Sequence, residues 1–150
     1  MTTVYLGLGT NIGNRKENLT RAIEELSLAL GDSIAVSSII ETEPWGFSTP
    51  VEPFLNQSFC CLTELEPQQV LEVCQRIETE LGRERKEPQF DADGKRIYES
   101  RPIDIDILAF ERQEGEEWKE VTVNAKDLVI PHPQLQSRDF AAKLYKELKE

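Results

Sequence analysis

The chain has 150 residues, and its 28 Asp and Glu against 17 Lys and Arg give a formal net charge of −11 at pH 7. Hydrophobic residues make up 39% of the sequence and charged residues 30%, which is typical of a single globular domain over residues 1–150. The acidic excess argues against nucleic acid or an anionic membrane as a partner, because such partners bind clustered Lys and Arg. An anionic small molecule is compatible with a local basic site.

Three cysteines, Cys60, Cys61 and Cys74, form no CxxC pair and predict buried thiols in a reducing compartment. The first residues, MTTVYLGLGTN, lack the basic start and long apolar stretch of a secretory signal. No apolar run in the sequence is long enough to span a bilayer. We therefore expect a cytoplasmic protein.

The first predicted elements are a strand, a tight turn and a helix. Val4 to Leu8 is apolar and ends at Gly9, and apolar residues then recur at helical spacing from Leu19 to Leu30 before Gly31. The glycines of the turn do not complete a GxGxxG motif, because Ile12 stands where a glycine is required. A structural turn is therefore favoured over a dinucleotide site.

The middle of the chain predicts two strands, a helix and a long loop. Residues 34–40 are rich in β-branched side chains and residues 57–62 are apolar, with a proline-containing loop between them. Pro67 begins a helix with one apolar face, and Gly82 ends it. Residues 86–100 carry no periodicity, and because loops of this length are usually functional, we expect a mobile lid that closes over bound substrates.

Strands at 103–110 and 118–123 and a closing helix at 139–148 complete the predicted elements. The order β, α, β, β, α, β, with two helices and four principal strands, favours a ferredoxin-like α+β sandwich. In that arrangement a mostly antiparallel sheet carries both helices on one face.

The stretch from Arg101 to Leu108, RPIDIDIL, is the most informative part of the sequence. Period-two alternation places its three isoleucines on one face and Asp104 and Asp106 on the other, with Cα atoms about 7 Å apart. Two carboxylates at that spacing repel each other unless a cation lies between them, and oxygen ligands favour Mg²⁺. A lone DxD pattern is more often the exposed face of a half-buried strand.

Arginines flank this strand in the sequence. Arg83 and Arg85 follow the second predicted helix, and Arg101 precedes the two carboxylates. Guanidinium groups beside a metal-binding pair suit a polyphosphate, because their paired N–H groups match phosphate oxygens. Surface ion pairs with the many glutamates are the alternative interpretation.

Two further patterns admit both a structural and a binding role. His132, the single histidine, lies between two prolines that fix its backbone, which suits either a structural turn or a donor that faces a ligand. Trp45, Phe54 and Asn56 bring two aromatic rings and an amide to one loop. Such a set clamps a flat heterocycle or simply packs a core beneath the loop.

The segments LGLGTNIGNR, ETEPWG, FLNQS, RIETELGRERK, RPIDIDIL and LVIPHPQLQSRDF occur in an order that resembles the 6-hydroxymethyl-7,8-dihydropterin pyrophosphokinases of folate biosynthesis. The resemblance extends from about Val4 to Phe140. It implies a ferredoxin-like fold and transfer of the terminal pyrophosphate of ATP to the pterin hydroxymethyl group, with release of AMP. The rival interpretations are a non-catalytic ferredoxin-like small-molecule sensor and a scaffold with an acidic docking face.

The resemblance also implies roles for individual residues. Asp104 and Asp106 match the carboxylates that hold two Mg²⁺ ions, and Arg83, Arg85 and Arg101 match catalytic arginines on the phosphate side. The implied ATP site comprises Gln75, Glu78, Arg85, Arg101, His132 and Arg138, and the implied pterin pocket comprises Thr42, Trp45, Phe54, Asn56 and Phe140. In that pocket Phe54 and Phe140 sandwich the ring. We expect a monomer whose partners are these two substrates, with no nucleic acid and no membrane.

Overall fold

The computed structural model describes residues 2–31, 33–43, 52–82, 89–90, 92–93, 96–97, 102–133 and 139–149, with the backbone alone at 89–90, 96–97 and 139–140. Its largest element is a six-stranded antiparallel sheet with the order β2-β4-β1-β7-β8, in which β3 also pairs with β4. The described strands are β1 Thr2–Thr10, β2 Ser33–Val36, β3 Ile40–Thr42, β4 Phe54–Thr63, β5 Gln89–Phe90, β6 Arg96–Ile97, β7 Asp104–Glu114, β8 Glu117–Glu120, β9 Val123–Asn124 and β10 Val129–Ile130. The described helices are α1 Arg15–Leu30, α2 Pro67–Glu80 and α3 Asp139–Lys149.

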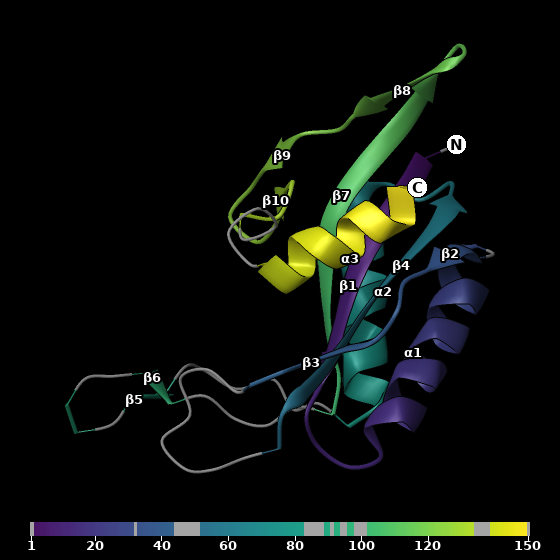
Figure 1. The fold of residues 1–150 in the computed structure, drawn as a ribbon. Coiled ribbons are helices and arrows are strands. Elements are labelled where there is room, and N and C mark those ends of the chain that lie inside the picture. The colour runs from purple at the N-terminus through teal and green to yellow at the C-terminus, as the bar shows by residue number, and fades with distance from the viewer. Residues whose placement is uncertain are drawn as a thin grey trace.

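Helices cover both faces of the sheet (Figure 1). The helices α1 and α2 pack side by side on one face, whereas α3 lies across the other. The strand order β2-β4-β1-β7 and the two helices between those strands confirm the predicted ferredoxin-like α+β sandwich. None of the described helices is long and apolar enough to cross a membrane.

The two main helices begin and end where the sequence supplies caps. The Asn14 side chain accepts a hydrogen bond from the Glu17 N–H at 3.2 Å and so caps α1. Gly31 follows α1 with φ +151°, and a Cβ there would collide with the Leu62 carbonyl oxygen, so only glycine fits. Pro67 occupies the first turn of α2, as predicted from its missing N–H.

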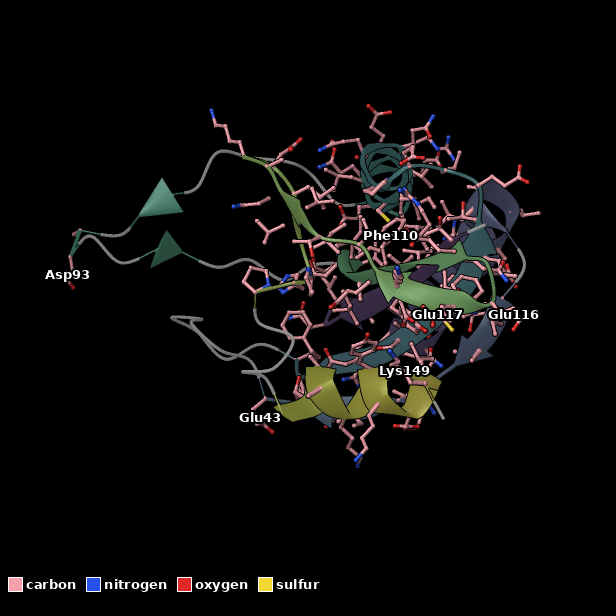
Figure 2. All side chains as sticks on the ribbon, turned by 90° about the horizontal axis from the view of Figure 1, so that it is seen from above. Glu43, Asp93, Phe110, Glu116, Glu117 and Lys149 are labelled. Carbon is pink, nitrogen blue, oxygen red and sulfur yellow. The ribbon has the colours of Figure 1, made fainter. Side chains whose placement is uncertain are left out.

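Alternation along the central strands divides the apolar side chains between two clusters. Val4, Leu6 and Leu8 of β1 enter the larger cluster beneath α1 and α2, together with Ile103, Ile105 and Ile107 at the start of β7. Tyr5 and Leu108 point to the opposite face, where they form a smaller cluster with Cys60, Ala109 and Leu148 under α3. Figure 2 shows the two sides, with Phe110 on the side of α2 and Lys149 on α3.

Polar contacts fix α3 on its face of the sheet. Lys149 Nζ lies 2.8 Å from Glu111 Oε1 of β7 and above the rings of Tyr5 and Tyr145, which pack edge to face at 5.1 Å. At the edge of the sheet, the Ser38 N–H and hydroxyl donate to Glu147 at 3.2 and 2.9 Å. The helix predicted at 139–148 is thus part of the folded domain.

Three predicted strands differ clearly from the observed ones. The strand predicted at 118–123 is divided into β8 and β9. The stretch 34–40 is divided into β2 and β3, because Ser37 between them uses its hydroxyl to accept from the Ser58 N–H at 2.8 Å and interrupts the regular ladder. The strand predicted at 103–110 runs to Glu114, because its end pairs with β8 across a tight turn at Gly115, where φ is +65°. Within 86–100 only the short β5–β6 pair and residues 92–93 are described, so the predicted lid lies largely outside the described residues.

Candidate functional site

The candidate site lies on the α3 face of the sheet, beyond the part of that face occupied by the smaller apolar cluster. Along β7 the side chains on this face are Leu108, which packs beneath α3, and then Asp106 and Asp104 toward the strand's beginning. Both aspartates are half-buried, whereas the three isoleucines that alternate with them are at most 6% exposed. The alternation predicted from RPIDIDIL is therefore confirmed.

Strand register places the Asp104 carboxylate and the Asn56 amide on either side of Gly9, which has no side chain. Asp104 pairs with Gly9 on β1, Gly9 pairs with Asn56 on β4, and Asn56 pairs with Ile40 on β3. A Cβ built at Gly9 would lie 3.4 Å from Asn56 Oδ1 and 3.6 Å from Phe54 Cδ1. Because Gly9 has no side chain, the peptide backbone forms a floor between the carboxylate and the amide.

Asn56 is held rigidly at the edge of this floor. Its side chain is 7% exposed, and Nδ2 donates to the Ile40 carbonyl at 3.1 Å and to Thr42 Oγ1 at 2.8 Å. Both amide hydrogens are thereby engaged, and the oxygen faces Gly9. An oriented amide beside the half-buried ring of Phe54 suits a flat ligand with hydrogen-bonding edges.

A histidine lies beside the part of β7 that carries the two aspartates. His132 Nε2 lies 4.0 Å from Asp106 Oδ1, and the His132 N–H donates to the Leu108 carbonyl at 2.9 Å. Residues far apart in the sequence therefore meet at the same end of β7. Among the described residues, no group of three or more His, Cys, Asp and Glu is placed to hold a metal. The donor set, two carboxylates, fits Mg²⁺, which usually keeps water and substrate phosphate oxygens as its remaining ligands.

Glu78 on α2 occupies the opposite side of the same strand. Its side chain is 2% exposed, and Oε2 accepts the Ile105 N–H at 2.9 Å, between the two aspartates. Gln75, three residues earlier on α2, is half-buried, and its carbonyl accepts from Thr79 Oγ1 at 3.0 Å. The structure thus places Glu78 beneath the carboxylate strand.

Comparisons with known proteins give a family match over nearly the whole chain. Residues 5–150 match the family model described as 7,8-dihydro-6-hydroxymethylpterin-pyrophosphokinase (HPPK). This chain belongs to the HPPK family. It is 42% identical over 140 residues to the 2-amino-4-hydroxy-6-hydroxymethyldihydropteridine pyrophosphokinase of Porphyromonas gingivalis, an alignment that covers 93% of this chain and 86% of the relative.

Enzymes of the same name from other bacteria are also similar to the chain. The HPPK enzyme of Methylorubrum extorquens is 39% identical, with 93% of this chain and 78% of the relative aligned. That of Aquifex aeolicus is 36% identical, with 93% and 76% aligned. The resemblance based on the sequence motifs is therefore confirmed at the level of the family.

The structure also shows two polar residues of this HPPK chain that the sequence analysis did not single out. Asn11 is 1% exposed, and its Nδ2 donates to the Glu52 carbonyl at 3.3 Å. Arg15 donates to the Pro53 carbonyl at 2.8 Å and lies 3.6 Å from Glu41. Together they fix the chain that enters β4 just before Phe54. The signal in the sequence was the pair of polar residues after the first strand, which we assigned to a structural turn.

Several predicted site residues lie outside the described part of the chain. These are Trp45, Arg83, Arg85, Arg101 and Arg138, together with the side chain of Phe140. Their roles rest on the sequence patterns and the family resemblance. Of the remaining candidates, the structure brings Thr42, Phe54 and Asn56 together on neighbouring strands, and Asp106 together with His132.

Proposed function

We propose that this chain transfers a pyrophosphoryl group from ATP to the hydroxymethyl group of 6-hydroxymethyl-7,8-dihydropterin and releases AMP, as a step of folate biosynthesis. Membership of the HPPK family supports the reaction. The observation that carries the proposal is the row formed by Asp104, Gly9 and Asn56 on three adjacent strands. This row supports a phosphate-and-metal side and a heterocycle pocket that share one continuous floor.

The pterin pocket occupies the β4 side of this floor. Hydrogen bonds to Thr42 and to the Ile40 carbonyl hold the Asn56 side chain in one orientation. Its amide is therefore already positioned to bind the polar edge of the heterocycle. Phe54 stacks on one ring face, and Phe140 and Trp45 complete the pocket. An aromatic stack with a fixed amide selects a flat, hydrogen-bonding substrate.

The ATP side is built around β7. Asp104 and Asp106 hold Mg²⁺, two ions in this proposal, and the metal supplies charge neutralisation at the phosphate oxygens when bound. Arg83, Arg85 and Arg101 bind the phosphates by paired hydrogen bonds, and Gln75, His132 and Arg138 complete the nucleotide site. In this proposal, local positive charge from the arginines and the metal allows a chain of net charge −11 to bind a polyanion.

The chemical step is a single in-line displacement. The pterin hydroxyl oxygen attacks the β-phosphorus of ATP and loses its proton to water, a new O–P bond forms, and the bond from the β-phosphorus to the bridging oxygen of AMP breaks. No covalent protein intermediate is required, because positioning and electrostatic stabilisation dominate transfers of this kind. In the same proposal the protein acts as a cytoplasmic monomer that binds no nucleic acid, since its acidic charge opposes that contact.

The reaction is tested by following ATP and its products by ³¹P NMR with and without the pterin. We expect pterin-dependent formation of AMP and a pterin diphosphate. Asp104→Asn or Asp106→Asn lowers the rate by about a hundredfold or more with the fold retained, because a lost metal ligand costs several kcal/mol at about 1.4 kcal/mol per tenfold change.

Glu114→Gln serves as the matched control, since Glu114 lies at the far end of the same strand and pairs with Lys119 at 3.0 Å. This variant keeps the wild-type rate. Formation of ADP in place of AMP would refute pyrophosphoryl transfer. Wild-type rates in both aspartate variants would refute the assignment of the metal ligands.

A further inference from the structure

The edge of β7 opposite β1 takes its hydrogen-bond partners from three different sources. Among the described strands, β8 pairs only with Glu111 to Glu114, so the earlier part of that edge has no neighbouring strand in a ladder. The Phe110 carbonyl accepts from the Val121 N–H at 2.8 Å, and the Leu108 carbonyl accepts from the His132 N–H at 2.9 Å. The Ile105 N–H donates instead to a side chain, Glu78 Oε2, at 2.9 Å.

Glu78 occupies a position of the helix that otherwise carries apolar side chains. The buried stripe of α2 consists of Val70, Cys74, Ile77 and Glu78, and all but Glu78 pack in the larger apolar cluster. It is the only buried charged side chain in the part of the chain that the structure describes. Burial of a carboxylate is unfavourable unless it gains strong hydrogen bonds, so a hydrophobic residue would suit packing alone better.

The contact of Glu78 lies between the two candidate metal ligands along β7. Ile105 separates Asp104 from Asp106, and the directions of both aspartate side chains follow from the backbone orientation at this residue. The bond also joins this strand to the last turn of α2, which ends at Glu80. Glu78 therefore determines how the segment that carries both carboxylates sits on the helix layer.

We propose that Glu78 is a positioning residue, whose buried carboxylate holds the Ile105 backbone so that Asp104 and Asp106 present their carboxylates to a shared divalent cation. This inference deepens the proposed function and rests on it. The resemblance implies a place for Glu78 in the ATP site; in this inference the residue, which is 2% exposed, acts instead from the core of the protein, without contact with the nucleotide. The length of the Glu78 side chain, which brings its acceptor oxygen to the Ile105 N–H, is essential for this role, and its negative charge is not.

Three substitutions test the length of the Glu78 side chain and its charge separately. Glu78→Gln keeps an acceptor oxygen at the same reach and removes the charge, whereas Glu78→Asp keeps the charge and shortens the side chain by one methylene. Glu78→Met keeps the volume and removes the acceptor. In the last two variants the Ile105 N–H loses its partner in the core, which is expected to loosen this part of β7.

The experiment is a Mg²⁺ titration of pterin-dependent AMP formation at saturating ATP and pterin. We expect Glu78→Asp and Glu78→Met to raise the half-saturating Mg²⁺ concentration by about tenfold, in the range for an unmet buried hydrogen bond. The KM for pterin stays within about twofold, because the pocket on β4 is untouched. Glu78→Gln stays close to the wild type in both constants.

A second readout does not depend on turnover. Amide exchange of Ile105, measured by NMR, accelerates in Glu78→Asp and Glu78→Met and stays slow in Glu78→Gln. Binding of Mn²⁺ with ATP, followed by water-proton relaxation, weakens in the same two variants. The control is Ile77→Val, which removes a buried methyl from the same helix stripe. It lowers the thermal midpoint and leaves the Mg²⁺ dependence unchanged.

The outcomes distinguish this inference from the proposed function. A wild-type protein that forms no AMP with pterin refutes the function, whereas Mn²⁺ binding and Ile105 exchange still report on Glu78. An active wild type with unchanged metal dependence in Glu78→Met refutes the positioning role alone. Loss of metal binding in Glu78→Gln but not in Glu78→Asp also refutes it, because charge would then be the essential property.

Discussion

At the residue scale, a missing side chain shapes the site as much as the side chains present. Gly9 and Gly7 lie on the same face of β1, next to Asp104 and Asp106 respectively. At Gly9 the nearest atoms to an added Cβ belong to Asn56 and Phe54, whereas at Gly7 they belong to the Leu108 side chain beneath α3. The two glycines therefore have different neighbours and different consequences for binding.

We expect Gly9→Ala to fold and to bind pterin more weakly than the wild type. Its methyl group would make ordinary contacts of 3.4 and 3.6 Å in the free protein, but it would occupy the floor on which the heterocycle lies. Overpacking of this kind costs about 1–3 kcal/mol, which weakens binding by roughly 5-fold to 150-fold. Titration calorimetry with pterin and with ATP measures both affinities, and ATP binding changes much less.

Gly7→Ala is the matched control for this substitution. Its Cβ would lie 3.3 Å from the tip of Leu108, a flexible side chain, so we expect lower stability with pterin affinity close to that of the wild type. Equal loss of pterin affinity in both variants would contradict the position of the pocket on the β4 side.

The three cysteines are expected to be inert in the folded protein. All are buried free thiols, as predicted from their spacing, and burial raises the pKa of Cys61 to about 12 and also raises that of Cys60 and Cys74. Because only the thiolate reacts, at pH 8 about one Cys61 in ten thousand is reactive. A chromogenic disulfide reagent should label none of the thiols in buffer and all three in denaturant. Rapid labelling of the native protein would contradict this burial.

At the scale of elements, α3 is attached by contacts that respond to pH. The Ser38 N–H and hydroxyl bind the Glu147 carboxylate and lower its pKa below the ordinary value of 4.5. Two residues further along the same end of the helix, the Glu111 carboxylate raises the pKa of Lys149. With Glu111 ionised, the stabilisation by the Lys149 charge is therefore fully present below the ordinary pKa of 10.5 and is lost as the pH rises through the raised value.

We expect the contribution of Glu147 to stability to disappear in acid. Its pKa is lower in the folded than in the unfolded protein, so the stabilisation is present above pH 4.5 and is lost as the pH falls through the folded value. Thermal unfolding of wild type and Glu147→Gln should differ at pH 7 and converge toward pH 3. Glu72→Gln, at an exposed site on α2, serves as the control and should show no such convergence. A difference that is constant with pH would contradict the assigned contact.

At the scale of the whole molecule, one sheet is the common wall of two apolar clusters. Neighbouring residues of β1 point to opposite faces, with Leu6 in the cluster beneath α1 and α2 and Tyr5 in the cluster beneath α3. Unfolding of the sheet would expose both apolar clusters to water. The helices on the two faces are therefore expected to unfold together.

We expect Leu26→Ala on α1 to destabilise α3 as much as α1. Leu26 is fully buried, and its truncation should lower the free energy of unfolding by about 2–5 kcal/mol. Native-state amide exchange should show this loss in the most protected amides of both helices. Leu28→Ala is the control, since Leu28 is 83% exposed and its change stays within about 0.5 kcal/mol. Unchanged protection of α3 in Leu26→Ala would show that the two faces unfold separately.

The sequence by itself determined the fold class, the two main helices and the alternation around Asp104 and Asp106. These features depend on local periodicity and on capping or breaking residues such as Asn14 and Gly31, which act within a few residues along the chain. The motifs also identified the family, because their order covers nearly the whole chain.

Only the tertiary structure decided which distant residues meet. Strand register set Gly9 between Asp104 and Asn56, and the fold brought a glutamate from α2 to the Ile105 N–H, on an edge of β7 where none of the described strands pairs. The break at Ser37 likewise depends on a hydrogen bond to Ser58, 21 residues away. Local sequence carries no signal for such pairings, because a buried polar group is satisfied by whichever partner the folded chain brings within reach.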